Sequence, residues 1–166
     1  MAVFRLNALY SSYDVVHGHI KPSNLYVSSN GGSLILGDFL PISYVYRLLE
    51  NDVIDKVYMS PELFKMRKTD KLLTEDIVSK DVLHKHDLFC LGLSLYYICM
   101  KVAPDSKLHR SKQVHGETLL RFATERSELT HLVKQCLSWN PDERPHHANA
   151  LSAAVSKMFN FSWLQG

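Results

Sequence analysis

The longest apolar run in the chain is Leu88–Met100, LFCLGLSLYYICM, and it constrains the fold most strongly. A helix with this sequence is apolar on every side, which is typical of a helix buried at the centre of a domain. Gly92 and Ser94 interrupt the run, which is too short to span a membrane. We predict that Asp87 caps a central buried helix and that Pro104 ends it.

The composition is that of an ordinary globular domain. The chain has 166 residues, of which 46% are hydrophobic and 22% are charged. Nineteen basic against seventeen acidic residues leave a formal charge of +2, too little for a nucleic-acid footprint, so we expect no nucleic-acid partner. The nine histidines lack the spacing of a zinc site. Three cysteines indicate buried thiols rather than disulfides, and the default compartment is therefore cytoplasmic.

Periodicity predicts a mainly α fold with one small antiparallel β-hairpin. Two short apolar runs, Leu25–Val27 and Leu34–Leu36, flank SSNGGS, whose Asn-Gly pair tolerates the positive φ angles of a hairpin turn. Pro61 suits the first turn of a further helix. The charged stretch 66–86 predicts a surface insertion. The other expected helices occupy residues 3–16, 117–138, as one helix or in pieces, and 146–159.

Five motifs then occur in a fixed order: HGHIKPSN at 17–24, GDFL at 37–40, SPE at 60–62, DLFCLG at 87–92 and NPDERP at 140–145. This set resembles the catalytic loop, metal-binding loop and later motifs of protein kinases. The resemblance runs from about residue 9 to 159. It implies a protein-kinase-like C-lobe over residues 1–160 and a short tail at 161–166.

The resemblance also implies a nucleotide site. Phosphoryl transfer depends on positioning and charge neutralisation, so it needs oxygen ligands for Mg²⁺ and a cation near the transferred group. Asn24 and Asp38 resemble the two metal ligands, and Lys21 resembles the cation that faces the phosphates. Tyr26 would form part of the adenine floor. The hairpin would bring Asn24 and Asp38 together, because antiparallel strands return the chain to its start.

Further residues resemble those that hold a kinase fold together. Glu62 and Arg144 resemble a buried ion pair that ties the activation segment to the helical base. Asp87 would hold the catalytic loop from beneath. His17 and Phe39 would stack in the regulatory spine. These roles are compatible with no catalysis at all.

The departures from the kinase pattern concern catalysis. His19 replaces the catalytic Asp, Gly18 replaces the usual Arg, and Leu40 replaces the Gly of D-F-G. An imidazole could take a proton near neutral pH, but His19 has no visible orienting carboxylate. No glycine-rich loop or β3 lysine precedes His17 in this sequence, so we expect the N-lobe to be absent and ATP and Mg²⁺ to bind weakly or not at all.

Three functions remain open at this point. The first is a catalytically deficient pseudokinase that acts through protein–protein contacts. The second is an active Ser/Thr protein kinase, with His19 as a substituted base, whose N-lobe is missing from this chain. The third is a binding scaffold that never meets nucleotide.

The resemblance also bears on partners and compartment. The lobe face that normally meets the N-lobe would need cover, from an N-lobe-like partner or an oligomer. The strings VHGH, LILGDF and LGLSLY are similar to the rhoptry kinase-like proteins of apicomplexan parasites. That narrower resemblance implies a secreted effector.

Overall fold

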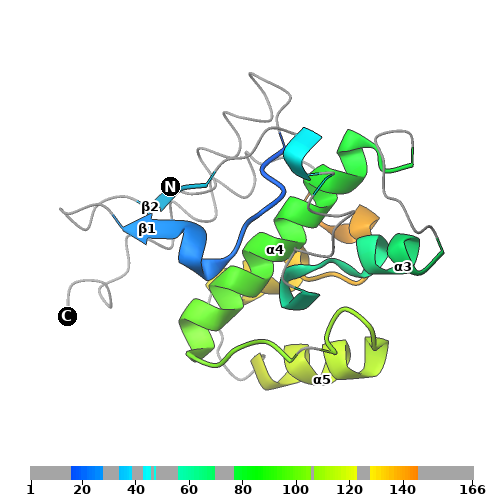
Figure 1. The fold of residues 1–166 in the computed structure, drawn as a ribbon. Coiled ribbons are helices and arrows are strands. Elements are labelled where there is room, and N and C mark those ends of the chain that lie inside the picture. Colours follow the sequence, from blue (N-terminus) through cyan, green and yellow to red (C-terminus); the bar gives the residue numbers. More distant parts are fainter. Residues whose placement is uncertain are drawn as a thin grey trace.

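In the described part of the chain the fold is mainly helical, as predicted (Figure 1). Several predictions lie outside the described residues. These are the helix at 146–159, nearly all of the helix at 3–16, the turn at 28–33, the roles of Phe39 and Leu40, and the tail. The computed structural model describes residues 16–27, 34–38, 43–45, 47, 56–69, 77–105, 107–122 and 128–145. The strands are β1 (Leu25–Val27) and β2 (Leu34–Leu36), and the helices are α3 (Pro61–Thr69), α4 (Lys80–Met100), α5 (Lys112–Phe122) and α6 (Glu128–Cys136). Short 3-10 turns cover Pro22–Asn24, Lys56–Tyr58 and Pro141–Glu143.

Helix α4 is the central buried helix, but it begins earlier than predicted. Its N-cap is Ser79, whose hydroxyl accepts a hydrogen bond from the Val82 amide at 3.4 Å. The prediction that Asp87 caps the helix is therefore wrong, because Asp87 lies within it. At the other end the helix stops at Met100, where Lys101 adopts a left-handed backbone with φ of 53°. Pro104 lies beyond that stop.

The predicted surface insertion at 66–86 is also wrong at both ends. Residues 66–69 complete α3, and residues 80–86 form the first turns of α4. Charged residues in those turns conceal a buried face, on which Leu83 and His86 stand one helical turn apart. The many charged residues in this segment therefore favoured the prediction of a surface loop, although its buried positions recur with the spacing of a helix.

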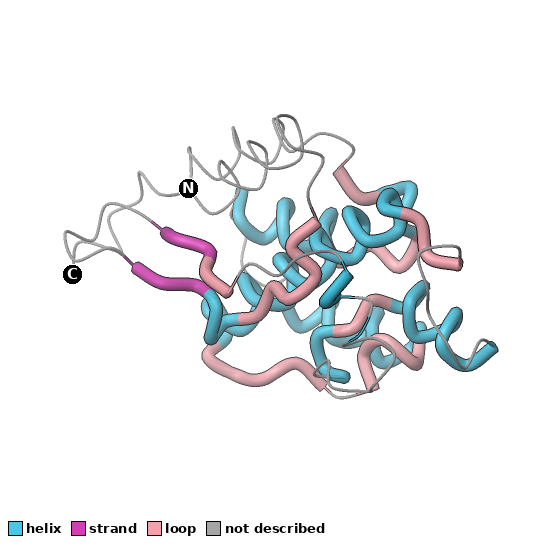
Figure 2. Tube along the Cα trace, turned by 45° about the horizontal axis from the view of Figure 1, so that its top comes forward, coloured by secondary structure: helices cyan, strands magenta, loops and turns pink. Residues whose placement is uncertain are grey.

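Helix α4 runs through the middle of the helical body (Figure 2), and the larger buried cluster is built around its side chains. Side chains of α4 such as Phe89 and Leu93 share one buried cluster with Leu132 and Val133 of α6. A second cluster joins Leu63 of α3 to the start of α4. The helical stretch expected at 117–138 is described in two parts, the end of α5, which begins earlier at Lys112, and α6.

Close packing of α4 on α6 depends on Gly92. A Cβ at Gly92 would lie 2.8 Å from the Cβ of Cys136 and 3.0 Å from Cγ of Leu137, whereas a Cβ at Gly116 in α5 would meet nothing within 4 Å. We expect Gly92→Ala to lower the free energy of unfolding by about 1–3 kcal/mol through overpacking. Gly116→Ala should raise it by about 0.5–1 kcal/mol, because alanine favours the helix. Urea denaturation measures both, and equal effects at the two glycines would contradict this account.

Strands β1 and β2 occupy the two apolar runs that suggested them. They pair antiparallel in a two-stranded sheet, with Leu25 opposite Leu36 and Val27 opposite Leu34. The Gly37 amide donates to the Asn24 carbonyl at 2.8 Å, which continues the pairing into the flanking loops. Both strands lie at one end of the helical body (Figure 2). No described helix is long and apolar enough to cross a membrane.

Candidate active site

The loop at 17–24 is fixed from below by one carboxylate. Asp87, fully buried in α4, accepts a hydrogen bond from the His17 amide at 2.7 Å and from the Gly18 amide at 2.8 Å. Burial of a carboxylate is costly unless such charge-assisted bonds compensate it. The central helix therefore sets the backbone position of the loop.

Gly18 is required by the backbone and by a neighbour. Its φ of +70° lies in the left-handed region, and a Cβ there would stand 2.4 Å from Cγ1 of Val45. From the sequence, Gly18 was interpreted only as a missing arginine. The structure shows that Val45 packs on the face where a side chain would begin.

His17 connects this loop to the second one. Its Nδ1 accepts a hydrogen bond from the His19 amide at 3.2 Å, so the ring proton resides on Nε2, which donates to the Gly37 carbonyl at 2.9 Å. Burial lowers the pKa of His17, although the hydrogen bond to Gly37 opposes that effect. A neutral imidazole thus bridges the loop at 17–24 and the residue before Asp38.

His19 and Asn24 are joined by one amide group. The Asn24 Nδ2 donates to the His19 carbonyl oxygen at 2.8 Å and lies 3.3 Å from the His19 Nδ1. Because a carbonyl oxygen can only accept, the amide nitrogen must face His19, and Nδ1 of the imidazole is therefore an acceptor. The imidazole proton then resides on Nε2. Asn24 is 2% exposed, which holds this arrangement in place.

Asp38 directly follows Gly37, whose amide donates to the Asn24 carbonyl at the end of the strand pairing. Its φ of 53° is rare for a residue with a side chain and costs about 1–2 kcal/mol. Lys21 is half-buried, and its backbone carbonyl accepts a hydrogen bond from the backbone N–H of Asn24 at 3.0 Å. The structure therefore brings Lys21, Asn24 and Asp38 into one region.

The oxygen groups of this region suit Mg²⁺. No described residue donates a hydrogen bond to the Asn24 Oδ1 or to the exposed Asp38 carboxylate. Mg²⁺ is commonly held by one or two such oxygens together with substrate phosphates and water. Among the described residues no cluster of three or more His, Cys, Asp or Glu side chains that could hold a metal occurs.

Tyr26 flanks this region on β1. Its ring is 48% exposed and lies against Gly37, where a Cβ would be 2.4 Å from the ring. Glycine at position 37 therefore makes room for the ring.

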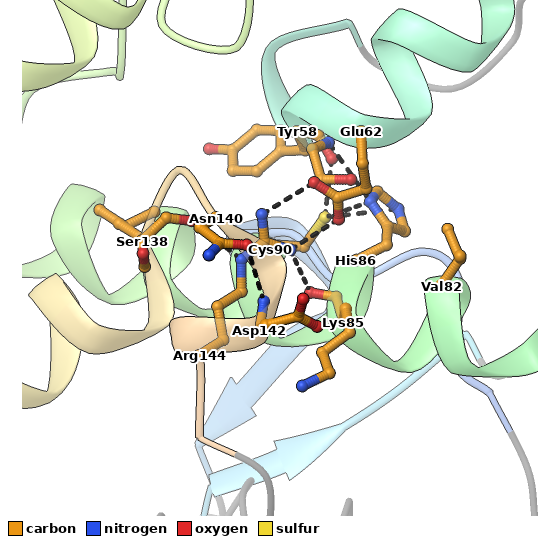
Figure 3. Close-up of polar contacts among 12 residues, drawn as sticks. Tyr58, Glu62, Val82, Lys85, His86, Cys90, Ser138, Asn140, Asp142 and Arg144 are labelled. Atoms are coloured by element: carbon orange, nitrogen blue, oxygen red, sulfur yellow. Dashed lines mark hydrogen bonds and ion pairs between the residues drawn. The ribbon is translucent and has the colours of Figure 1, made fainter.

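A buried ion pair joins Glu62 of α3 to Arg144 (Figure 3). Arg144 is 1% exposed and binds both carboxylate oxygens of Glu62, through NH1 at 2.6 Å and NH2 at 2.8 Å. It also donates to the carbonyls of Lys85 and Ser138, at 2.8 and 3.0 Å. Burial raises the pKa of Glu62, but the bonds and charge of Arg144 outweigh it, so the net pKa is lowered. The pair joins α3, α4 and the turn at 140–145.

Sequence reasoning missed the His86–Cys90 pair beside this ion pair (Figure 3). His86 Nδ1 accepts the Ser60 amide at 3.4 Å, and the Cys90 thiol donates to the Tyr58 carbonyl at 2.7 Å. Burial is the main cause that lowers the pKa of His86 to about 4 and raises the pKa of Cys90 well above its usual value. A spacing of four residues at the edge of the apolar run was the available signal. Both groups are neutral and serve the fold.

The comparisons with known proteins agree with this architecture. The family model described as "Protein kinase domain" matches residues 3–156. The chain is 26% identical over 150 residues to G2-specific protein kinase nim-1 of Neurospora crassa, covering 87% of this chain and 16% of that protein. It is 24% identical over 150 residues to G2-specific protein kinase nimA of Emericella nidulans, covering 87% and 20%. It is 27% identical over 159 residues to serine/threonine-protein kinase ppk13 of Schizosaccharomyces pombe, covering 82% and 42%.

The chain belongs to the protein kinase family, because the family model covers most of it. Members of this family use ATP and Mg²⁺ and act on protein substrates. The chain spans between 16% and 42% of the lengths of these three relatives. The narrower resemblance to rhoptry kinase-like proteins stays a prediction.

Proposed function

We propose that this chain is a pseudokinase: a kinase-like C-lobe that does not transfer phosphate and acts through contacts with other proteins. The observation that carries the proposal is His19, which stands at the position of the catalytic Asp and whose Nδ1 faces the Asn24 amide. General-base catalysis is typically worth a factor of about 10² to 10⁴ in rate. A base must offer a lone pair to the substrate hydroxyl, and His19 presents Nε2–H instead.

The preserved features are compatible with a role in binding. Asp87, Glu62 and Arg144 keep bonds that fix loops and helices relative to one another. Such bonds maintain a defined surface whether or not chemistry occurs there. ATP and Mg²⁺ would be held by Lys21, Asn24, Tyr26 and Asp38 if they bind at all, and we propose that their binding is weak.

An active Ser/Thr kinase is the second candidate. It is favoured by one observation, the proximity of Asn24 and Asp38 that the strand pairing creates. The names of the matched relatives point the same way, since each is a protein kinase. In this alternative His19 would need the opposite tautomer, which would sacrifice its contact with Asn24.

A phosphoryl-transfer assay separates the two candidates. The purified protein is incubated with radiolabelled ATP, Mg²⁺ and a generic protein substrate. An active kinase, assayed in parallel, serves as the positive control. We expect the wild-type chain to transfer no more phosphate than Asp38→Ala. Transfer by the wild type that Asp38→Ala abolishes would establish an active kinase instead. Thermal-shift titration with ATP, with and without Mg²⁺, then separates a nucleotide-binding pseudokinase from a scaffold, because ligand binding raises Tm.

A further inference from the structure

A surface pocket of about 530 Å³ lies between α3, the turn at 107–110 and the loop that precedes Pro141. It is separate from the loops that carry Asn24 and Asp38. Its volume falls within the range of pockets that bind ligands. The residues that give it its character are Phe64, Lys65 and Lys68 of α3, His109 and Arg110 of the turn, and Trp139 of the loop.

The pocket carries an excess of positive charge. Lys68 Nζ lies 4.9 Å and the Arg110 guanidinium carbon 5.1 Å from the centre of the Phe64 ring. Two cations from different elements therefore converge on one ring, and Lys65 adds a third to the lining. Among the described residues no carboxylate pairs with any of the three. The one acidic residue in the lining, Glu62, is engaged by Arg144 at 2.6 Å.

A buried histidine holds one of these cations in place. Arg110 Nε donates to His109 Nε2 at 3.1 Å, so His109 accepts at Nε2 and carries its proton on Nδ1. His109 is 1% exposed and packs edge-on against Phe64, with ring centres 4.7 Å apart. Its Nδ1 has no hydrogen-bond partner in the described part of the chain. A neutral imidazole thus orients the guanidinium without cancelling its charge.

Apolar surface accompanies the cations. Phe64 is only partly buried, and Trp139 is fixed by an edge-on contact with His115 at 5.4 Å. Fixed aromatic rings bordered by arginine are common anchors of protein interfaces, because they bury large area at low entropic cost. This combination fits alternating acidic and apolar side chains better than a free inorganic anion.

We propose that this pocket is a docking site for a protein partner, and that its occupant is an extended acidic segment whose carboxylates meet Lys68 and Arg110 while an apolar side chain covers Phe64. The choice of occupant rests on charge complementarity. The pocket would be the surface through which the proposed pseudokinase contacts its partner. The proposal rests on the proposed function in one respect, that the partner is a protein.

The test measures binding of a short fluorescein-labelled peptide of alternating Glu and Leu by fluorescence polarisation, without nucleotide. We expect saturable binding that weakens as salt is raised, because screening acts on exposed charges. Lys68→Glu and Arg110→Glu should each weaken it about tenfold or more, a loss that corresponds to about 1.4 kcal/mol. Lys134→Glu on α6, a charge reversal outside the pocket lining, should leave it unchanged. Phe64→Leu should also weaken peptide binding, because the aromatic ring is lost although an apolar side chain remains.

Several results would overturn the proposal. Equal binding of a peptide with Lys in place of Glu, or equal loss with Lys134→Glu, would exclude a specific acidic site. Displacement by inorganic phosphate as effective as by unlabelled peptide would indicate a small-anion site. Binding that appears only after Asp70→Asn, Glu75→Gln and Asp76→Asn would show that the chain's own acidic residues are the occupant. Because no phosphate transfer is measured, failure here and failure of the pseudokinase proposal are independent.

Discussion

Replacing Arg144 with methionine is expected to lower the free energy of unfolding by about 3–5 kcal/mol. The substitution leaves the Glu62 carboxylate buried without its bidentate partner, and it strands the carbonyls of Lys85 and Ser138. Arg144→Lys should recover only part of this loss. A lysine ammonium lacks the planar fork that binds two carboxylate oxygens and two carbonyls at once. Urea denaturation monitored by circular dichroism provides the measurement.

The controls separate the ion pair from a general loss of charge. Glu117→Gln, an exposed change on α5, should shift stability by less than about 0.5 kcal/mol. The double variant Arg144→Met with Glu62→Leu should be more stable than Arg144→Met alone, because no uncompensated buried charge remains. If Arg144→Met cost under about 1 kcal/mol, or if the double variant were no better, the pair would not hold α3 to the helical base.

Stability is expected to fall steeply as pH decreases from 6.5 toward 4, and His86 is the main named cause. Burial lowers its pKa to about 4 from 6.5, with smaller effects of Glu62, Arg144 and His19. Between pH 6.5 and 4 the unfolded chain therefore binds a proton at His86 that the folded chain does not bind. The contribution is complete above pH 6.5 and decreases as pH falls, by about 2 kcal/mol at pH 5. His109, with its pKa lowered to about 4 chiefly by burial, acts in the same direction.

Two histidine variants test this origin. His86→Gln removes the titrating group and keeps an acceptor for the Ser60 amide, so the slope of unfolding free energy against pH should flatten by about one proton between pH 6 and 4.5. His131→Gln changes an exposed imidazole on α6 and should leave the slope unchanged. An unchanged slope in His86→Gln would assign the acid sensitivity to other groups. Loss of the Glu62 contribution lies lower, because its lowered pKa places it below pH 4.5.

The sequence predicted secondary structure best where a residue type or pattern is strongly associated with one kind of local structure. Pro61 begins α3, and the apolar runs 25–27 and 34–36 form the paired strands. The central helix was recognisable from its apolar run, but its start was not. Ser79 was hidden as a cap because the residues after it look like a charged surface loop, although Leu83 and His86 face inward.

Within the candidate site, residue types were visible but tautomers and neighbours were not. The sequence placed His19 at the position of a base, yet only the structure shows that the Asn24 amide faces its Nδ1. Gly18 was interpreted through what it lacks, while the contact with Val45 gives it a positive packing role. The docking pocket had no sequence signal, because Lys68 and Arg110 meet through tertiary packing and are far apart in the chain.

The two buried cysteines have a consequence for the chemistry of the folded chain. Burial raises the pKa of Cys136 to about 12, and burial together with nearby carboxylates raises the pKa of Cys90 well above its usual value. Alkylating agents and oxidants attack the thiolate, which burial disfavours for both groups in the native state. Cys90 and Cys136 become reactive only in molecules whose helices α4 and α6 have separated. The rate at which these sulfurs are alkylated therefore reports how often the centre of the protein opens, without any added label.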